Sequence, residues 1–237
     1  MLRRAVHQQV RKRSAAAVAS RRLGLAIAGL ALVVSGCAED AIRLPEKQPN
    51  LLLLVIDCLR ADHVGVNGYE RETTPNLDRL AAEGVNFTRA FSQAQWTRPS
   101  LPALLTGLYP SEHGLISLAQ GKDRAAGKAL SPEVETVAEA LKQRGYDTAL
   151  IGNQAQLSRR FGLTQGFDTY RSNVKRAPRI NKLFLEWAAA REGAPFFAYL
   201  HYLEIHWPYC PPGSTRGLFN DGTSDLALCK GSRRLKA

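Results

Sequence analysis

Short apolar runs alternate with amphipathic segments along the chain. Three apolar runs have the length and composition of buried strands, at residues 51–56, 146–152 and 196–202. Helix signals fall between and beside them, at residues 74–84, 99–106, 131–144 and 178–191. Residues 85–91 alternate apolar and polar side chains at their start and predict one further strand. Strands that alternate with helices predict an α/β fold, a mostly parallel sheet with helices on both faces.

Prolines mark the predicted starts of the helices. Pro75 follows Thr74, which is the predicted N-cap, and the Ser-Pro pair at 131–132 repeats that arrangement. Pro99 also suits a first helical position, so Thr97 is expected to lie in the loop before its helix. A loop that ends at a helix N-terminus would present the Thr97 hydroxyl to an anion.

Asp57 and His206 occupy matching positions near the ends of two predicted strands. Asp57 follows the apolar run 51–56, and His206 lies shortly after the run 196–202. In parallel α/β sheets, ligands bind outside the carboxyl ends of the strands. The pattern therefore predicts a carboxylate and an imidazole on one rim, with the Thr97 hydroxyl as a further candidate. A carboxylate and a hydroxyl near a helix N-terminus suit a metal ion and a tetrahedral oxyanion.

The positive charge of the chain is concentrated at its N-terminus. The 237 residues carry a formal net charge of +11, but residues 1–37 hold seven Arg and Lys residues and no Asp or Glu. Residues 38–237 therefore carry only +4, which gives no reason to expect nucleic-acid binding. The composition, 45% hydrophobic and 22% charged, is that of an ordinary globular protein with room for one sizeable domain.

The basic N-terminal segment leads into an apolar run at residues 23–34, which is short for a membrane span and suits a signal peptide. The run ends in Val-Ser-Gly before Cys37, which resembles the lipobox of bacterial lipoproteins. The resemblance implies a lipoprotein signal at residues 1–37, lipid on Cys37 and a polar tether at residues 38–49. The chain would then be an exported lipoprotein of the bacterial cell envelope, anchored to the membrane on its periplasmic or extracellular face. A plain secretory signal or an uncleaved anchor, with Cys37 incidental, is the alternative.

Three cysteines follow Cys37, namely Cys58, Cys210 and Cys229. An exported chain permits a disulfide, most simply between Cys210 and Cys229, but the odd count leaves one thiol over. The spacing of the three cysteines is not that of a zinc site.

Five motifs, taken together and in order, resemble the sulfatase family within the alkaline-phosphatase-like superfamily. They are Val-Ile-Asp-Cys-Leu-Arg-Ala-Asp-His at 55–63, Thr-Pro-Asn-Leu-Asp-Arg-Leu-Ala at 74–81, Thr-Arg-Pro-Ser at 97–100, Leu-Leu-Thr-Gly-Leu-Tyr-Pro at 104–110 and His-Trp-Pro-Tyr at 206–209. The resemblance covers most of residues 50–237 and implies the alkaline-phosphatase-like α/β fold.

The resemblance also implies a chemistry, the hydrolysis of sulfuric or phosphoric esters with a divalent metal ion. Asp57 matches a ligand of that ion, which is usually calcium in sulfatases. Thr97 matches the nucleophile position, and Ser100 of the same motif is assigned to substrate binding. His206 matches a histidine that contacts the transferred group or the leaving oxygen, as a general acid or a charge stabiliser.

Four residues depart from the pattern of the family. No formylglycine is expected at Thr97, because that maturation uses Cys or Ser. Leu101 replaces the Arg of the motif, and Asn153 stands where sulfatases commonly carry Lys, so two contacts to the anion lose their charge. Cys58 occupies the place of a second metal-binding Asp, and a thiol is a poor ligand for calcium. A phospho-group transferase that uses a Thr nucleophile is therefore an alternative function.

The other polar residues of these motifs are assigned to structure. Asp62, His63 and His113 are expected to form loop-stabilising hydrogen bonds. His201, at the end of an apolar strand, is expected to be a satisfied core or rim histidine.

The chain ends before the position at which the family supplies its remaining metal ligands, often in an Asp-His-Gly segment. Residues 50–237 are therefore expected to be the N-terminal portion of the catalytic domain, with the fold incomplete at the C-terminus. An inactive fragment that retains only the fold is the corresponding alternative.

Overall fold

The computed structural model describes residues 48–116, 128–191, 193–207, 214–215 and 218, all within the compact unit Gln48–Ala237. The predictions for residues 1–37 and the lipid on Cys37 lie outside the described residues. The same holds for Cys210, for Cys229 and for the last two residues of the His-Trp-Pro-Tyr motif.

Four parallel strands form one sheet in the order β1-β4-β2-β3. They are β1 (Leu51–Ile56), β2 (Asp147–Gly152), β3 (Thr169–Arg171) and β4 (Phe196–Tyr202). The register pairs Ile56 with Tyr202 and Gly152 with His201, so three carboxyl ends meet along one edge. Beyond the last pair, the backbone N–H of Asp57 donates to the Tyr202 carbonyl at 2.9 Å, which fixes Asp57 to the end of β4.

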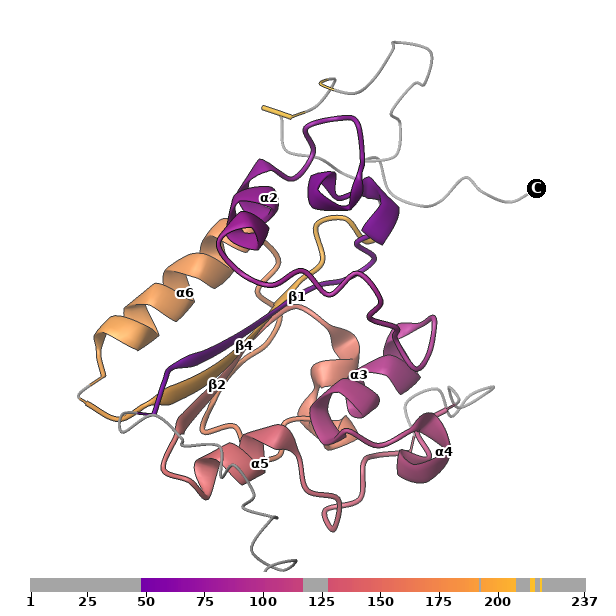
Figure 1. Cartoon of the computed structure of the whole chain (residues 1–237). Coiled ribbons are helices and arrows are strands. Elements are labelled where there is room, and N and C mark those ends of the chain that lie inside the picture. Colours follow the sequence, from indigo (N-terminus) through magenta and orange to yellow (C-terminus); the bar gives the residue numbers. More distant parts are fainter. Residues whose placement is uncertain (1–47, 117–127, 192, 208–213, 216–217, 219–237) are drawn as a thin grey trace, which may run out of the picture. The chain divides into compact units, whose positions relative to one another are not determined.

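Helices cover both faces of the sheet, as the sequence predicts. Helix α6 packs against β2 and β4 on one side, whereas α5 packs against β2 and α3 against α5 on the other side (Figure 1). Within the described residues, none of the helices has the length and apolar character that crossing a bilayer requires. The α-helices are α2 (Pro75–Ala82), α3 (Thr97–Thr106), α4 (Pro110–His113), α5 (Val137–Lys142) and α6 (Ala177–Ala189).

The hydrophobic core lies on both sides of the central strands β2 and β4. Leu101 and Leu105 of α3 belong to one cluster with Leu150 and Tyr199 of the sheet. Ile180 of α6 packs with residues of β2 and β4 in a second cluster. Because α3 is held in the core by these leucines, the position of its N-terminus relative to the sheet is fixed.

Helix α3 begins two residues earlier than the proline signal predicts. Thr97 is its first residue, Trp96 is the N-cap in an extended conformation, and Pro99 is the third residue. A proline fits there because the first four N–H groups of a helix have no partner within the helix. The prediction that Thr97 lies in a loop was therefore wrong, and its side chain projects from the first turn of α3.

Two further predictions of secondary structure were wrong. Residues 131–134 form turns, and the helix begins only at Val137, where Thr136 and Glu139 form a reciprocal capping box. Residues 85–91 form no strand, and Val85, Phe87 and Phe91 are each more than three-quarters exposed. The three-residue strand β3 was not predicted, because so short a segment carries no periodicity.

Candidate active site

The Asp57 side chain is the centre of a hydrogen-bond cluster at the carboxyl edge of the sheet. Only 11% of the side chain is exposed. Its Oδ2 accepts hydrogen bonds from Gln154 Nε2 at 2.8 Å, from His201 Nε2 at 3.3 Å and from Thr97 Oγ1 at 3.5 Å. Its Oδ1 accepts from Cys58 Sγ at 3.3 Å. Donors from the turn after β1, from the segment after β2, from β4 and from α3 therefore converge on one carboxylate.

A buried column of side chains supports Asp57 from beneath. The His201 side chain is 1% exposed, and the Tyr199 hydroxyl lies 2.8 Å from its Nδ1. Because an ionised carboxylate can only accept hydrogen bonds, His201 Nε2 carries the hydrogen that faces Asp57. In the tautomer with the hydrogen on Nε2, Nδ1 accepts from the tyrosine hydroxyl. His201 is a satisfied histidine, as predicted, and it orients the Asp57 carboxylate as well.

The surroundings of Asp57 favour its ionised form. The hydrogen bond from His201 is the largest of several influences that lower the pKa of this carboxyl to about 2, while burial acts in the opposite direction. Hydrogen bonds from Cys58 and Gln154 lower the pKa further. A carboxylate with so low a pKa is a weak proton acceptor at neutral pH. Asp57 is therefore suited to bind a cation or hold a hydroxyl rather than to act as a general base.

We expect the substitution His201→Leu to lower the unfolding free energy at neutral pH and to make that free energy less dependent on pH. The lowered pKa of Asp57 corresponds to on the order of 2 kcal/mol of unfolding free energy. Because the folded-state pKa lies below the usual 3.8, this contribution is present above about pH 4 and is lost as the pH falls through about 2. Urea unfolding between pH 6 and pH 2, with NMR titration of the Asp57 carboxyl, measures the effect.

The exposed ion pair of Asp62 serves as a control for that measurement. His63→Leu removes a contact to Asp62 and leaves Asp57 untouched, so the Asp57 titration should stay unchanged. An Asp57 pKa that is equal in the wild type and in His201→Leu would contradict the role assigned to His201.

Thr97 projects towards Asp57 because α3 is anchored at its first turn. The neighbouring Arg98 is 2% exposed and donates to Gln156 Oε1 at 2.8 Å and to the Lys128 carbonyl. Its guanidinium also stacks over the Phe161 ring. These contacts hold the N-terminus of α3, and with it the positive end of the helix dipole, beside the Asp57 carboxylate.

Ser100 lies on the same helix but is not part of the cluster around Asp57. Its hydroxyl lies 2.9 Å from the hydroxyl of Ser92, in the loop before α3. The contacts of the described residues therefore connect Ser100 with this loop, and its assignment to substrate binding stays a prediction.

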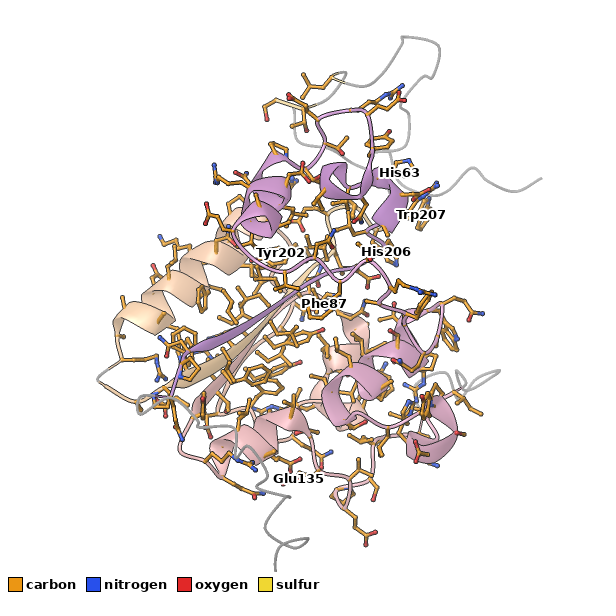
Figure 2. The ribbon with its side chains drawn as sticks, viewed as in Figure 1. His63, Phe87, Glu135, Tyr202, His206 and Trp207 are labelled. Carbon is orange, nitrogen blue, oxygen red and sulfur yellow. The ribbon has the colours of Figure 1, made fainter. Side chains whose placement is uncertain are left out.

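His206 and Cys58 complete the rim of the site. One oxygen of Asp57, the sulfur of Cys58 and a ring nitrogen of His206 all lie within 4.8 Å of one another. His206 lies in the segment that follows β4, next to Trp207 (Figure 2). Burial and the neighbouring Asp57 carboxylate raise the pKa of the Cys58 thiol. The predicted meeting of Asp57 and His206 at the edge of the sheet is present in the structure.

Gln154 and Tyr199 are the members of this cluster that the sequence analysis missed. Gln154 comes two residues after β2, whose carboxyl end lies on the same edge as that of β4. That position was a usable signal, because it follows the carboxyl end of a predicted strand. Tyr199 lies two residues before His201 in the same predicted strand, so the two side chains share one face of β4, and this spacing was a usable signal as well.

The other histidines and Asp62 have the structural roles that were predicted. Asp62 pairs with Arg60 and contacts His63, and His63 stacks on Tyr69. His113 is buried, with Nε2 at 3.2 Å from the Pro99 carbonyl and Nδ1 accepting from a backbone N–H.

The parallel sheet, with a carboxylate, a hydroxyl and an imidazole at its carboxyl edge, defines an α/β protein of the alkaline-phosphatase-like fold. The chain belongs to the sulfatase family, whose family model matches residues 49–226. The family and the fold predicted from the motifs are both confirmed.

Relatives in sequence are sulfatases that are longer than this chain. Steryl-sulfatase of Mus musculus is 41% identical over 111 residues, covering 45% of this chain and 18% of that protein. Arylsulfatase of Clostridium perfringens is 36% identical over 106 residues, covering 44% of this chain and 20% of that protein. The chain thus matches a minor part of the length of these curated relatives.

Solved structures share the fold. The protein BT4656, solved in complex with its substrate D-glucosamine-2-N,6-O-disulfate, has a TM-score of 0.61 at 22% identity. The match covers 74% of this chain and 38% of that chain. A phosphonate monoester hydrolase of Agrobacterium radiobacter has a TM-score of 0.58 at 22% identity, covering 70% of this chain and 43% of that chain. At this identity the likeness establishes the architecture alone.

Proposed function

We propose that the protein hydrolyses sulfate esters at the edge of the sheet formed by β1, β4 and β2, with Thr97 as the nucleophile. One observation carries this proposal. The Thr97 hydroxyl projects from the start of a core-anchored helix onto the Asp57 carboxylate, at 3.5 Å, in a chain of the sulfatase family. Membership of the sulfatase family supports the ester chemistry, and the position of the Thr97 hydroxyl beside Asp57 supports its role as the nucleophile.

In the proposed first step, Thr97 Oγ1 gives its proton to solvent and forms a bond to the ester sulfur. The bond between sulfur and the leaving oxygen breaks, and that oxygen keeps the electron pair and takes up a proton from water. His206 stabilises the charge that develops there. Water then attacks the sulfate on Thr97, which releases inorganic sulfate and restores the hydroxyl.

Asp57 has a positioning role in this scheme and is the proposed ligand of a divalent cation. Its low pKa keeps it ionised, so it accepts the Thr97 hydrogen bond and attracts a cation at neutral pH. The first turn of α3 adds the positive end of a helix dipole near the developing negative charge. Ser100 remains the proposed contact to the substrate.

The sulfatase family is generally metal-dependent, and the resemblance implies calcium. The His, Cys, Asp and Glu side chains that gather at the site among the described residues do not fit that ion. Calcium takes six to eight oxygen ligands, whereas the described cluster of possible ligands holds one carboxylate, one thiol and one imidazole. No step of the proposed reaction is therefore assigned to calcium.

A lipid anchor on Cys37 and a place in the bacterial cell envelope stay proposals of the sequence. They are supported by the basic segment, the apolar run at residues 23–34 and the Val-Ser-Gly-Cys ending at residue 37. With a signal at residues 1–37 and a tether at residues 38–49, the domain from residue 50 would act on sulfate esters near a membrane surface.

The proposed function is tested by assaying the purified chain with each of several divalent metals against an aryl sulfate, a phosphomonoester and a phosphodiester. We expect turnover of the aryl sulfate to exceed that of both phosphate esters. Turnover of phosphate esters alone would instead favour the alternative of a phospho-group transferase. Metal binding without any turnover would favour the alternative of a fragment that retains only the fold.

A further inference from the structure

The cluster of Asp57, Cys58 and His206 differs in chemistry from an oxygen-lined calcium site. We propose that these three residues bind a thiophilic divalent cation of the zinc type. The proposal concerns the same site as the proposed function and rests on it for location only, because metal binding is measured without turnover.

The spacing of the three ligand atoms suits a small cation. The Asp57 oxygen, the Cys58 sulfur and the His206 nitrogen lie within 4.8 Å of one another, and Cys58 Sγ is 3.3 Å from Asp57 Oδ1. A tetrahedral zinc ion, with bonds of about 2.0–2.3 Å, holds its ligand atoms about 3.3–3.8 Å apart. One pair is already at this separation, and the His206 ring needs only a small approach to complete three ligands. A water or a substrate oxygen would be the fourth ligand.

The His206 ring is arranged as metal-binding histidines usually are. Its Nδ1 lies 2.7 Å from the Trp207 carbonyl oxygen, which can only accept a hydrogen bond. Nδ1 therefore carries the hydrogen, and Nε2 keeps the lone pair that a cation requires. This contact fixes the tautomer independently of the cluster itself.

The two oxygens of the Asp57 carboxylate have different partners, so one can hold the group in place while the other binds a cation. Oδ2 accepts from Gln154, His201 and Thr97, which hold the group in place from three elements. Oδ1 faces Cys58. A cation beside Oδ1 would bind Asp57 through the oxygen that faces the thiol, while Oδ2 keeps its supporting hydrogen bonds.

Cys58 decides which cation the site prefers. A thiolate is a soft ligand that selects zinc-like ions over calcium and magnesium. On binding, the Cys58 sulfur forms a bond to the cation and its S–H proton passes to solvent, so each metal ion bound releases one proton from this group. A bound cation would supply the positive charge that the proposed reaction assigns to His206.

The test is the metal preference of the full-length chain, purified in reduced form. Wild-type protein should bind one Zn²⁺, and Cd²⁺ or Co²⁺ in its place should give thiolate-to-metal charge-transfer absorption. Cys58→Asp should abolish this absorption, weaken Zn²⁺ binding about tenfold or more and strengthen Ca²⁺ binding. Cys58→Ser is the second variant, and it should lose Zn²⁺ affinity without gaining affinity for Ca²⁺.

A chain with Cys37, Cys210 and Cys229 all replaced by Ser is the matched control, and it should keep the absorption because Cys58 remains. The proposal is overturned if the wild type shows no thiolate-to-metal absorption, or if Cys58→Asp leaves both metal affinities unchanged. Absorption that is present in a chain without sulfatase turnover would overturn the proposed function and leave the metal site standing. Turnover without the absorption would overturn the metal site and leave the proposed function standing.

Discussion

Thr97→Val is expected to lower the turnover of sulfate esters by about 10³-fold or more, because it removes the hydroxyl that forms the proposed covalent intermediate. Thr97→Ser keeps the hydroxyl and should retain activity within about tenfold. Measuring kcat for both variants against an aryl sulfate checks the prediction. Mass spectrometry should detect a sulfate adduct on the wild-type residue and on the serine variant.

Loss of the fold would not explain such an effect. The Thr97 hydroxyl contacts Asp57 at 3.5 Å, and the N-cap of α3 is Trp96, so neither variant removes a capping hydrogen bond. Valine is close to threonine in shape, and we expect both variants to unfold within about 1 kcal/mol of the wild type. Retention of full activity by Thr97→Val would exclude Thr97 as the nucleophile.

The strands were predictable because their signals are local. Residues 51–56 and 196–202 are continuous apolar runs with turn residues or proline at their borders, and both strands have these bounds in the structure. Their shared edge follows from a general rule for parallel sheets, so the approach of Asp57 to His206 could be predicted without coordinates.

The rest of the site depends on register, which the sequence does not state. Tyr199 contacts His201 within β4. In contrast, His201 contacts Asp57 from the neighbouring strand β4, and Gln154 contacts Asp57 from the segment that follows β2. In the sequence, each of these residues looks like an ordinary core or loop residue. A one-residue shift in the pairing of β1 with β4 would turn these side chains to the opposite face. The motifs therefore predicted the approach of Asp57, Thr97 and His206, but not the residues that hold them.

The two wrong helix starts arise because proline suits more than one kind of position. It is tolerated at several positions of the first turn of a helix, as at Pro99, and it also suits the second position of a β-turn, as at Pro132. At Pro99 the helix begins two residues earlier, and after Pro132 it begins five residues later, at Val137. Residues 85–91 failed for another reason, since alternation describes a strand only where a partner strand covers it.

Two departures from the family pattern, at Leu101 and Asn153, remove positive charge that would contact the anion. Leu101 is buried in the core with 4% exposure and cannot contact an anion at the site. Arg98 does not replace the lost charge in the described contacts, because its guanidinium is directed to Gln156 and Lys128. Asn153 is neutral as well. In the proposed reaction, the helix dipole of α3 and the proposed cation therefore take over the role of the Arg and Lys that the family pattern carries.

Asp57→Asn tests this dependence, and it should weaken binding of Zn²⁺ about 100-fold and lower sulfate-ester turnover about 10³-fold. Asparagine keeps the size of the side chain but carries no charge. With its carbonyl oxygen in the place of Oδ2, its amide N–H group faces the Cys58 thiol, which donates to Oδ1 in the wild type. Titration calorimetry with Zn²⁺ and kcat against an aryl sulfate measure the two effects.

The same substitution should cost on the order of 2 kcal/mol of unfolding free energy at pH 7, because the neutral amide loses what the ionised carboxyl gains from its low pKa. Below about pH 2 the stabilities of Asp57→Asn and the wild type should converge, since the wild-type carboxyl is then protonated. Asp62→Asn is the matched control, because Asp62 forms an exposed pair with Arg60 outside the cluster, and it should leave Zn²⁺ binding and turnover unchanged. Equal losses in the two variants would mean that nonspecific charge, rather than the convergence of four donors on Asp57, governs the site.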